Sequence, residues 1–310
     1  MENTNFISNP ILTAIAQGIN NRALIGGLIL PVHMVGRSEF KYHALDPSLE
    51  SFKAGDDALA ATALPNEARL AMASHTASTE GYGLVSHIAQ KTVDEAPEGY
   101  DPIQKAAESI TKRLWLGHEL RVAAMVKAAG NYKTTQALGA DGTKKISDAT
   151  ADLPAMLLEQ LERAILRPNQ LTLGRDVATK LRTHPSIVAA ISASGTEKGI
   201  VKLEALADLL EVDRILVGGA LANSSKGKNH NLTNPWAGVF AGHYVDSGAN
   251  PGMLEDDATF GFTAMSLDFD VSESFSADRG PRGTTSVKVA SEMVELVTAK
   301  DAGVLLTSVL

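Results

Sequence analysis

Length, composition and charge place this chain among folded proteins that need no covalent cross-links. It has 310 residues, of which 44% are hydrophobic and 21% charged, with a net charge of −8 and no cysteine. The missing cysteines exclude disulfides, thiolate metal sites and thiol catalysis, and the negative charge argues against a surface of clustered Lys and Arg that binds phosphates. No apolar run approaches the ~20 residues that span a bilayer. The first residues, Met1, Glu2 and Asn3, lack the positive charge with which a signal peptide begins. We therefore expect no membrane contact.

The front of the chain, through about residue 85, contains little that could form a core. Residues 11–19 have apolar side chains at helical spacing, while 28–35 and 40–43 predict two strand pieces around a turn. Residues 46–81 show no sustained period, so we expect an extended loop that projects from the domain. Such a segment is ordered mainly by touching another molecule, and the simplest candidate is another copy of the same protein.

A long amphipathic helix is predicted over residues 101–129. Residues 82–93 before it alternate as a strand does, and Asp101 and Pro102 suit the N-cap and first position of a helix. Gly130 is a reasonable stop, and the helix would span about 43 Å at 1.5 Å per residue. The apolar residues that recur near the 3.6-residue period are Ile103, Ala106, Ala107, Ile110, Leu114, Gly117, Leu120, Ala124, Met125 and Ala128.

The second half alternates between helical and strand patterns, as a regular α/β domain does. Helices are expected over residues 152–166, 177–181, 187–191 and 203–210. Strands are expected over residues 170–173, 214–219, 239–245, 262–269, 286–299 and 304–309.

No motif in the sequence predicts a catalytic or metal-binding site. His118 and Glu119 lie inside the long helix without the second histidine of a zinc-protease motif, and His184 before Pro185 suits a helix start better than an acid–base pair. His230 and His243 lack a Ser or Asp constellation. We therefore assign no catalytic, cofactor-binding or metal-binding residue and expect no cofactor and no enzymatic activity.

Two further patterns have simple structural interpretations. Residues 81–86 begin like a dinucleotide loop but lack its third glycine, and a strand follows where a helix should stand. The acidic cluster 255–257 could hold a divalent cation through oxygen ligands, but a solvated loop is the commoner role. The absence of motifs suits a structural protein.

Taken in order along the chain, several segments resemble the major capsid proteins of tailed bacteriophages, which share the HK97-type fold. Residues 28–36 with 40–42 look like the segment that joins the N-terminal arm to the E-loop, and 116–123 ending in 131–132 look like the latter part of the spine helix. Residues 168–174 with His184 and Pro185 look like the start of the A-domain. The remaining matching pieces are 214–218, 222–223, 236–238 and 301–306.

The resemblance implies an α+β, HK97-like capsid fold with an N-terminal arm, an extended E-loop, a P-domain containing the spine helix and an α/β A-domain. We expect the N-arm at 1–30, a P-domain strand segment at 31–45 and the E-loop at 46–82. The other expected parts are the P-domain with spine helix 101–129 at 83–149, the A-domain at 150–260, the P-domain return strands at 261–298 and the A-domain C-terminal strand at 299–310.

The resemblance also implies the partners. Subunits of this family form hexamers and pentamers that close an icosahedral shell around double-stranded DNA, which they contact non-specifically. We expect separate scaffolding and portal proteins, a possible decoration protein, assembly in the cytoplasm of the host bacterium and a final location in the virion capsid. A compact globule of this mass would expose roughly 12,000 Å², and a subunit with extended arms should exceed that value.

Two other functions stay open at this stage. The first is an encapsulin-like shell, which has the same fold but encloses protein cargo. The second is an α/β enzyme whose catalytic domain lies within residues 152–245. Large closed particles favour a shell, and the cargo distinguishes a phage head from an encapsulin.

Overall fold

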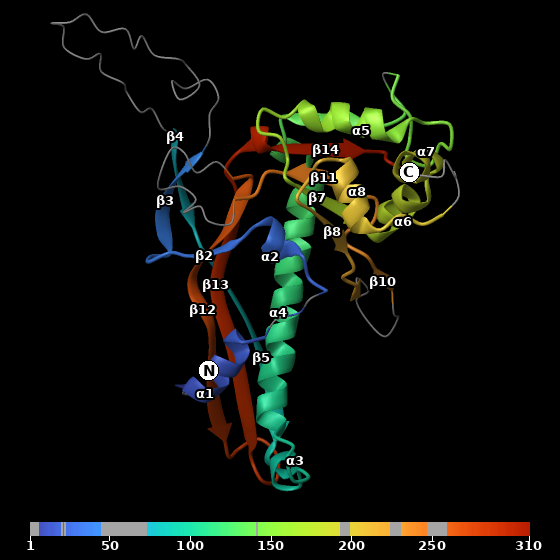
Figure 1. Cartoon of the computed structure of the whole chain (residues 1–310). Helices are drawn as coiled ribbons and strands as arrows, with labels where there is room; N and C mark the ends of the chain where they lie inside the picture. The colour runs from blue at the N-terminus through green and yellow to red at the C-terminus, as the bar shows by residue number, and fades with distance from the viewer. Residues whose placement is uncertain are drawn as a thin grey trace, which may run out of the picture.

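The protein consists of a long sheet-and-helix body that carries a broad α/β domain at one end (Figure 1). The computed structural model describes residues 6–19, 21, 23–44, 73–140, 142–192, 199–223, 231–246 and 259–310. The accessible surface of the chain is 17,200 Å², well above the roughly 12,000 Å² of a compact globule of this mass. The expected excess of surface is therefore confirmed.

The body is built on a sheet that we call the spine sheet. Its order is β1 (Ile7–Ser8), β12 (Gly261–Ser276), β13 (Thr284–Val297) and β5 (Glu80–Ala89), and β2 (Val32–Met34) pairs with β12 in parallel. β12 and β13 form a long antiparallel hairpin that is irregular near Leu267. Its turn uses Gly280 and Gly283 at φ +78° and +87°, a conformation that glycine adopts without steric cost.

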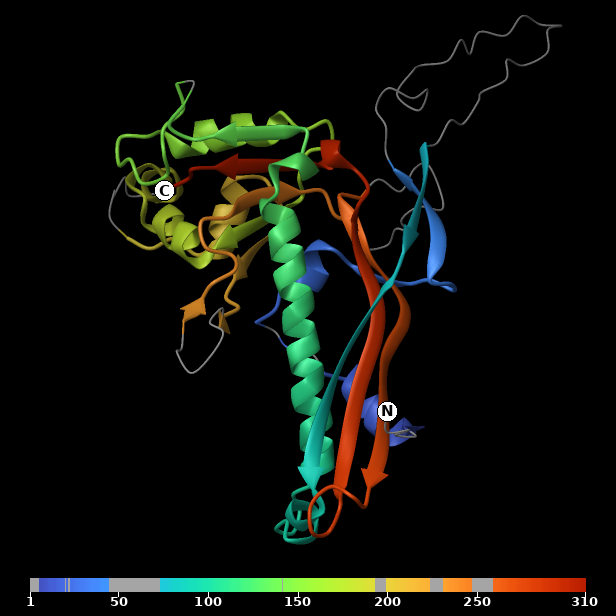
Figure 2. The ribbon, with the colours of Figure 1, turned by 180° about the vertical axis from the view of Figure 1, so that it is seen from behind.

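Helix α4 (Pro102–Lys127) runs along one face of the spine sheet (Figure 2). Asp101 caps it by accepting hydrogen bonds from the backbone N–H groups of Ile103 and Gln104 at 2.8 and 3.3 Å, as the sequence predicted. Its 26 residues extend about 39 Å at 1.5 Å per residue. The predicted long helix is thus confirmed.

The predicted buried stripe of α4 is wrong in its second half. Gly117, Leu120 and Ala124 were expected to face the core, yet Leu120 and Ala124 are exposed, whereas His118 and Glu119 are buried. The prediction placed the stripe on the wrong residues because it considered only apolar side chains. Two polar residues of this helix point inward and are hydrogen-bonded there. The residues of α4 that are buried are Pro102, Ala107, Ile110, Thr111, Leu114, His118, Glu119, Val122, Ala123 and Val126.

The core of the body lies between α4, the spine sheet and helix α1 (Pro10–Gln17). Asn9 caps α1 through hydrogen bonds from the backbone N–H groups of Ile11 and Leu12. Leu12 and Ala16 pack with Ile110 and Leu114 of α4 onto Phe269 and its neighbours in the sheet. The N-terminal arm is therefore held to the body by a real apolar contact.

The α/β domain contains a five-stranded mixed sheet. Its order is β6 (Thr134–Ala137), β14 (Gly303–Thr307), β11 (Phe240–His243), β7 (Gln170–Gly174) and β8 (Arg214–Gly218). The helices of the domain are α5 (Leu153–Glu162), α6 (Arg175–Thr183), α7 (Pro185–Ile191) and α8 (Leu203–Leu209). They share one continuous apolar core with the sheet.

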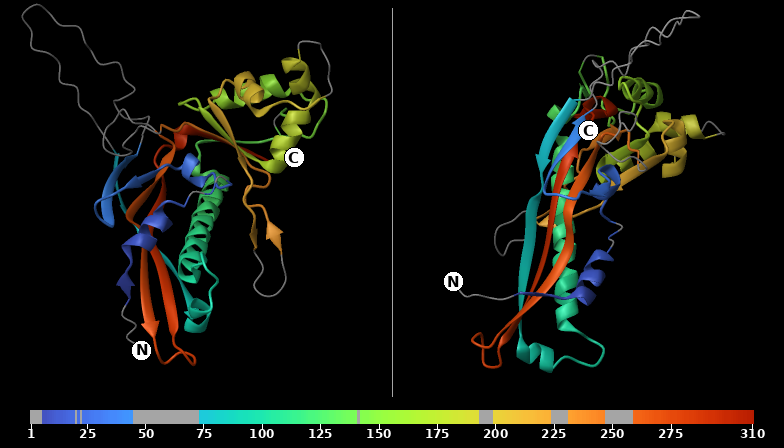
Figure 3. Two further views of the ribbon diagram at one scale, coloured as in Figure 1. Left: turned by 60° about the horizontal axis from the view of Figure 1, so that its bottom comes forward. Right: turned by 90° about the vertical axis from the view of Figure 1, so that its left-hand side faces the viewer.

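A two-stranded hairpin branches from the far side of the spine sheet (Figure 3). It consists of β3 (Glu39–Ala44) and β4 (Ala73–Ser78), which pair in antiparallel register from Glu39 opposite Ser78 to Ala44 opposite Ala73. The segment 46–81 was expected to lack regular structure, but its last part is strand, because β4 and the start of β5 lie in it. Residues 45–72, most of the predicted E-loop, lie outside the described residues.

Several short elements were not predicted. Helix α2 (Gly26–Ile29) overlaps the start of a segment that was predicted to be a strand, and residues 90–93 form helix α3 (Gln90–Asp94) instead of continuing a strand. β12 extends beyond Phe269 to Ser276. Strands β9 (Ala222–Asn223) and β10 (Leu232–Thr233) form a small hairpin, and 3-10 turns occupy Ala129–Asn131 and Lys300–Ala302.

One segment near an expected domain boundary packs with the α/β domain. Residues 134–149 were placed with the spine helix, but β6 pairs with β14 of the α/β sheet, and Leu138 and Ile146 lie in the core of the α/β domain. The pairing of β6 depends on the C-terminal strand, which is distant in sequence, and a four-residue strand has too weak an alternation to predict it.

Candidate functional site

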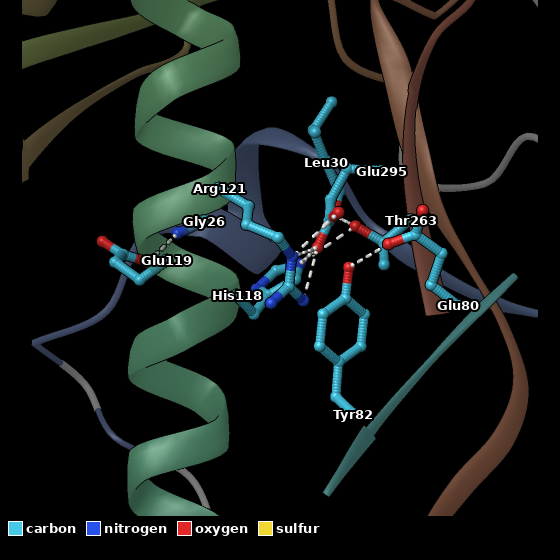
Figure 4. A network of polar contacts seen from close by, with 9 residues as sticks. All are labelled: Gly26, Leu30, Glu80, Tyr82, His118, Glu119, Arg121, Thr263 and Glu295. Carbon is cyan, nitrogen blue, oxygen red and sulfur yellow. Dashed lines mark hydrogen bonds and ion pairs between the residues drawn. The ribbon is translucent and has the colours of Figure 1, made fainter. Parts of the chain in front are cut away.

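One turn of α4 places buried polar side chains on two sides of the helix, and these join α4 to the rest of the molecule (Figure 4). Glu119 points toward Gly26 of α2, while His118 and Arg121 point toward the strands. No cluster of metal-ligating side chains occurs among the described residues, and none of the helices described is long and apolar enough to cross a membrane. We call His118, Glu119 and Arg121, together with the residues that they contact, the polar joint.

Glu119 connects three separate parts of the chain. Its Oε1 accepts hydrogen bonds from the backbone N–H of Ile25 at 3.1 Å and from Nε1 of Trp236 at 2.7 Å, and its Oε2 accepts one from the N–H of Gly26 at 2.6 Å. The Ile25 and Gly26 donors stand at the start of α2, where backbone N–H groups lack partners within the helix. Glu119 is only 1% exposed, so all three hydrogen bonds form away from solvent.

Close packing around Glu119 explains why glycine and tryptophan occupy their positions. A Cβ atom at Gly26 would lie 2.8 Å from Oε2 of Glu119, and one at Gly218 would overlap the ring of Trp236. Trp236 is fully buried in a cluster that also contains Val122 of α4 and Phe260 at the start of β12. Trp236 therefore contributes both a hydrogen bond and apolar packing to the contact between the α/β domain and α4.

On the other side of α4, His118 and Arg121 contact the spine sheet. Arg121 Nε donates to both carboxylate oxygens of Glu295 on β13, at 2.9 and 3.2 Å. The Arg121 guanidinium also lies 3.8 Å from the centre of the Tyr82 ring on β5, a cation–π contact. Tyr82 in turn donates its hydroxyl proton to Glu80 at 3.0 Å. One arginine thus ties α4 to two strands of the sheet.

His118 is neutral in the folded protein. Burial, and secondly the Arg121 charge, lower its pKa to about 4. Its Nε2 lies 3.1 Å from the hydroxyl of Thr263 on β12, and that hydroxyl donates to the carbonyl of Leu30 at 3.3 Å. Since Thr263 has only one hydroxyl proton to give, Nε2 of His118 carries the ring proton and donates it.

A second buried histidine, His243 on β11, lies where the α/β sheet meets the spine sheet. Its Nε2 lies 2.9 Å from the Tyr132 hydroxyl, its Nδ1 is 3.4 Å from Thr172 Oγ1, and its ring centre is 4.4 Å from that of Phe260. Burial lowers the pKa of His243 to about 3 and raises the pKa of Tyr132 well above its usual value. Both shifts favour the uncharged forms of His243 and Tyr132.

The other residues considered from sequence do not form a reactive site. His184 is the N-cap of α7 and bonds to Ser186 and to the Asp148 carbonyl, which confirms its predicted role as a helix start. Residues 81–86 lie within extended strand β5, so they form no phosphate loop. His230 and the acidic residues 255–257 lie outside the described residues.

Comparison with known proteins decides the family. No protein-family profile matches the chain. The major capsid protein of Pseudomonas phage JBD67 is 33% identical over 304 residues, which cover 98% of this chain and 97% of that protein. The chain belongs to the phage major capsid proteins. The major capsid protein of Burkholderia phage BcepMu is 27% identical over 252 residues, covering 77% of this chain and 76% of that one.

Solved structures agree on the fold of this capsid protein. A phage-related protein from Bordetella bronchiseptica RB50 superposes with a TM-score of 0.75 at 18% identity, and 98% of each chain is covered. The capsid structure of cyanophage P-SCSP1u superposes with a TM-score of 0.57 at 14% identity, covering 94% of this chain and 89% of that one. The fold is α+β and HK97-like, as the sequence resemblance implied, and the protein is structural, not an enzyme.

The joint itself was missed by sequence reasoning. Residues His118 and Glu119 were examined only as a failed zinc motif. A signal for them does exist in the sequence: two adjacent polar residues occupy positions where a long amphipathic helix should bury apolar side chains. Because polar groups buried in a protein are almost always hydrogen-bonded, such residues indicate partners elsewhere in the fold. The partners Trp236 and Thr263, each more than a hundred residues away, have no such signal.

Proposed function

We propose that this capsid protein assembles as hexamers and pentamers into an icosahedral shell that encloses double-stranded DNA. Its family membership, carried by 33% identity over nearly the whole chain, is the observation that supports this most strongly. The proposed place of assembly is the cytoplasm of the host bacterium, with separate scaffolding and portal proteins and, in the finished particle, room for a decoration protein.

The parts of the subunit have different proposed roles in the shell. We propose that the N-terminal segment with α1 acts as the N-arm, that the hairpin β3–β4 is the base of the E-loop, and that α4 with the spine sheet is the P-domain. The α/β domain would be the A-domain, with residues 134–149 included. Apolar residues exposed on the arm and body, such as Ile11, Met34 and Val85 at 74%, 63% and 45%, suit contacts between copies, since large exposed apolar surfaces mark interaction sites.

Electron microscopy of particles from cells that express the chain together with the other head proteins of its phage tests this proposal. We expect closed shells of uniform diameter that protect double-stranded DNA from nuclease. Uniform small oligomers under these conditions would contradict shell assembly. Closed shells filled with a protein cargo and free of DNA would instead indicate an encapsulin-like compartment, which the phage relatives do not favour.

A further inference from the structure

The exposed face of α4 carries a basic patch in a protein whose net charge is −8. Lys105, Lys112 and Arg113 are exposed along this face and line a groove of about 500 Å³. The connector between α1 and α2 forms one wall of the groove through Asn21 and Leu24, and residues 219–221, which lead into β9, form another. The groove lies on the side of α4 that faces away from the spine sheet.

Local carboxylates neutralise only part of this patch. Lys105 Nζ lies 2.9 Å from Oε2 of Glu108, which is the acidic residue of the groove lining. Among the described residues, no carboxylate lies within ion-pair distance of Lys112 or Arg113. The Glu108 carboxylate also interacts with the charge of Lys112, one turn further along α4. The groove therefore keeps an excess of positive charge at the adjacent residues Lys112 and Arg113, one turn before Leu116.

The other end of the groove is apolar. Leu24 and Leu116 line it together with Ala220 and Leu221, and the Leu221 side chain is 51% exposed. Leu120, one turn beyond Leu116 on α4, extends this strip and is 39% exposed. A leucine strip beside Lys112 and Arg113 is complementary to a segment with leucines on one face and carboxylates beside them.

We propose that this groove binds an acidic amphipathic helix of a separate assembly protein. A helix placed along α4 would bury its apolar face against Leu116 and Leu221, as helices do in hydrophobic grooves, while its carboxylates would pair with Lys112 and Arg113. A phosphate backbone would use the two cations but would leave the leucines uncovered. The inference rests on the proposed function, because it assigns a docking surface to a partner that assists shell assembly.

The test uses unassembled wild-type subunit and a labelled, acetylated peptide of about 18 residues, five turns of helix, with Leu spaced three and four residues apart and Glu elsewhere. We expect saturable binding by fluorescence anisotropy that weakens with salt, since exposed ion pairs are screened. The double variant Lys112→Glu/Arg113→Glu should bind at least about tenfold more weakly. A peptide with Lys in place of Glu should prefer that variant over the wild type.

A matched control carries the same change of charge elsewhere. Lys180→Glu/Lys202→Glu alters two exposed lysines of the α/β domain and should leave the affinity unchanged. Absence of saturable binding, or equal weakening in both double variants, would overturn the proposal. A short DNA duplex that binds in place of the peptide and is lost with Lys112→Glu/Arg113→Glu would make the groove a nucleic-acid site, and self-association lost in that variant would make it a contact between copies. Shell formation by the wild type is scored separately, so a failure here leaves the proposed function standing.

Discussion

The two halves of this capsid subunit solve the problem of burying apolar surface differently. The α/β domain covers its sheet with helices and closes a core from residues of β7, β11, β14 and four helices. The spine sheet is covered by α4 and α1 on one side, and its outer strand β5 has Leu84 and Val85 more than 40% exposed. The α/β domain closes a large core within a single chain, although Ile165 and Ile200 are exposed on it, whereas the outer strand of the spine sheet exposes apolar side chains that a neighbouring chain can cover.

This difference raises the question of what stabilises the extended body in the unassembled subunit. The body has an apolar core between α4, α1 and the spine sheet, and polar contacts of α4 add to it. His118 bonds to Thr263 of the spine sheet, and Glu119 bonds to Trp236, which joins the body to the α/β domain. We therefore expect perturbations of the joint to affect the whole subunit and perturbations of the projecting hairpin to affect only the assembly. The following predictions separate these two cases, beginning with the largest effect.

Replacing residues 45–72, the segment of the sequence between β3 and β4, should abolish shells. Ala44 and Ala73 are paired across β3 and β4, so residues 45–72 can be replaced by Asn-Gly, which closes a two-residue hairpin turn. We expect complete loss of closed particles in electron microscopy while the unfolding transition of the soluble subunit is retained. Intact shells from this variant would contradict the role of the hairpin as an interlocking loop.

Removing the Glu119 carboxylate should destabilise the subunit strongly. In Glu119→Ala, the N–H groups of Ile25 and Gly26 and Nε1 of Trp236 lose their acceptor in a buried site. We expect a loss of roughly 3–5 kcal/mol in the free energy of unfolding, measured with urea. Glu159→Ala, an exposed change on α5, is the control and should stay within about 0.5 kcal/mol. Equal stability of the two variants would show that the joint is dispensable.

Acidification should weaken the subunit through the buried histidines His118 and His243. The pKa values of His118 and His243 fall to about 4 and about 3 on folding, so between these values and pH ~6.5 the unfolded chain binds more protons than the folded protein. Stability is therefore full above pH ~6.5 and falls as the pH drops, by up to about 1.4 kcal/mol per pH unit for each histidine.

Urea unfolding of the unassembled subunit at several pH values measures this slope. Replacing one histidine, as in His118→Gln, should lower the slope between pH ~6.5 and ~4.5 by up to about 1.4 kcal/mol per pH unit relative to the wild type. Carboxylates that titrate at low pH are shared by both proteins and cancel in the comparison. An unchanged slope in His118→Gln would mean that His118 is not held neutral by the fold.

Two glycine substitutions should differ in sign as well as size. A Cβ at Gly218 would overlap the Trp236 ring, whereas a Cβ at Gly27 would meet no atom within 4 Å. Gly218→Ala should therefore cost about 1–3 kcal/mol from overpacking, and Gly27→Ala, inside α2, should be neutral or stabilising by up to about 1 kcal/mol. Thermal unfolding of both variants provides the comparison, and equal effects would argue against a tight contact at Trp236.

Local signals in the sequence predicted α4, its Asp101 cap and most elements of the α/β domain, because those features depend on residues close together in the chain. The polar joint could not be predicted in the same way. Its partners come from α4, α2, β12 and the loop that carries Trp236, and only the folded chain brings them together. The stripe of α4 was misplaced for the same reason, since its inward-facing polar residues are recognisable only once their partners are known.

Hydrogen exchange measured on the unassembled subunit and on closed shells tests the central claim most directly. Backbone amides of β7 and β11 should be protected in both states, because the α/β core is complete in one chain. Amides of β3 and β4, which pair only with each other, should exchange fast in the subunit and become protected only in shells. Equal protection of these strands in both states would contradict the claim that the body depends on neighbouring copies to cover its surface.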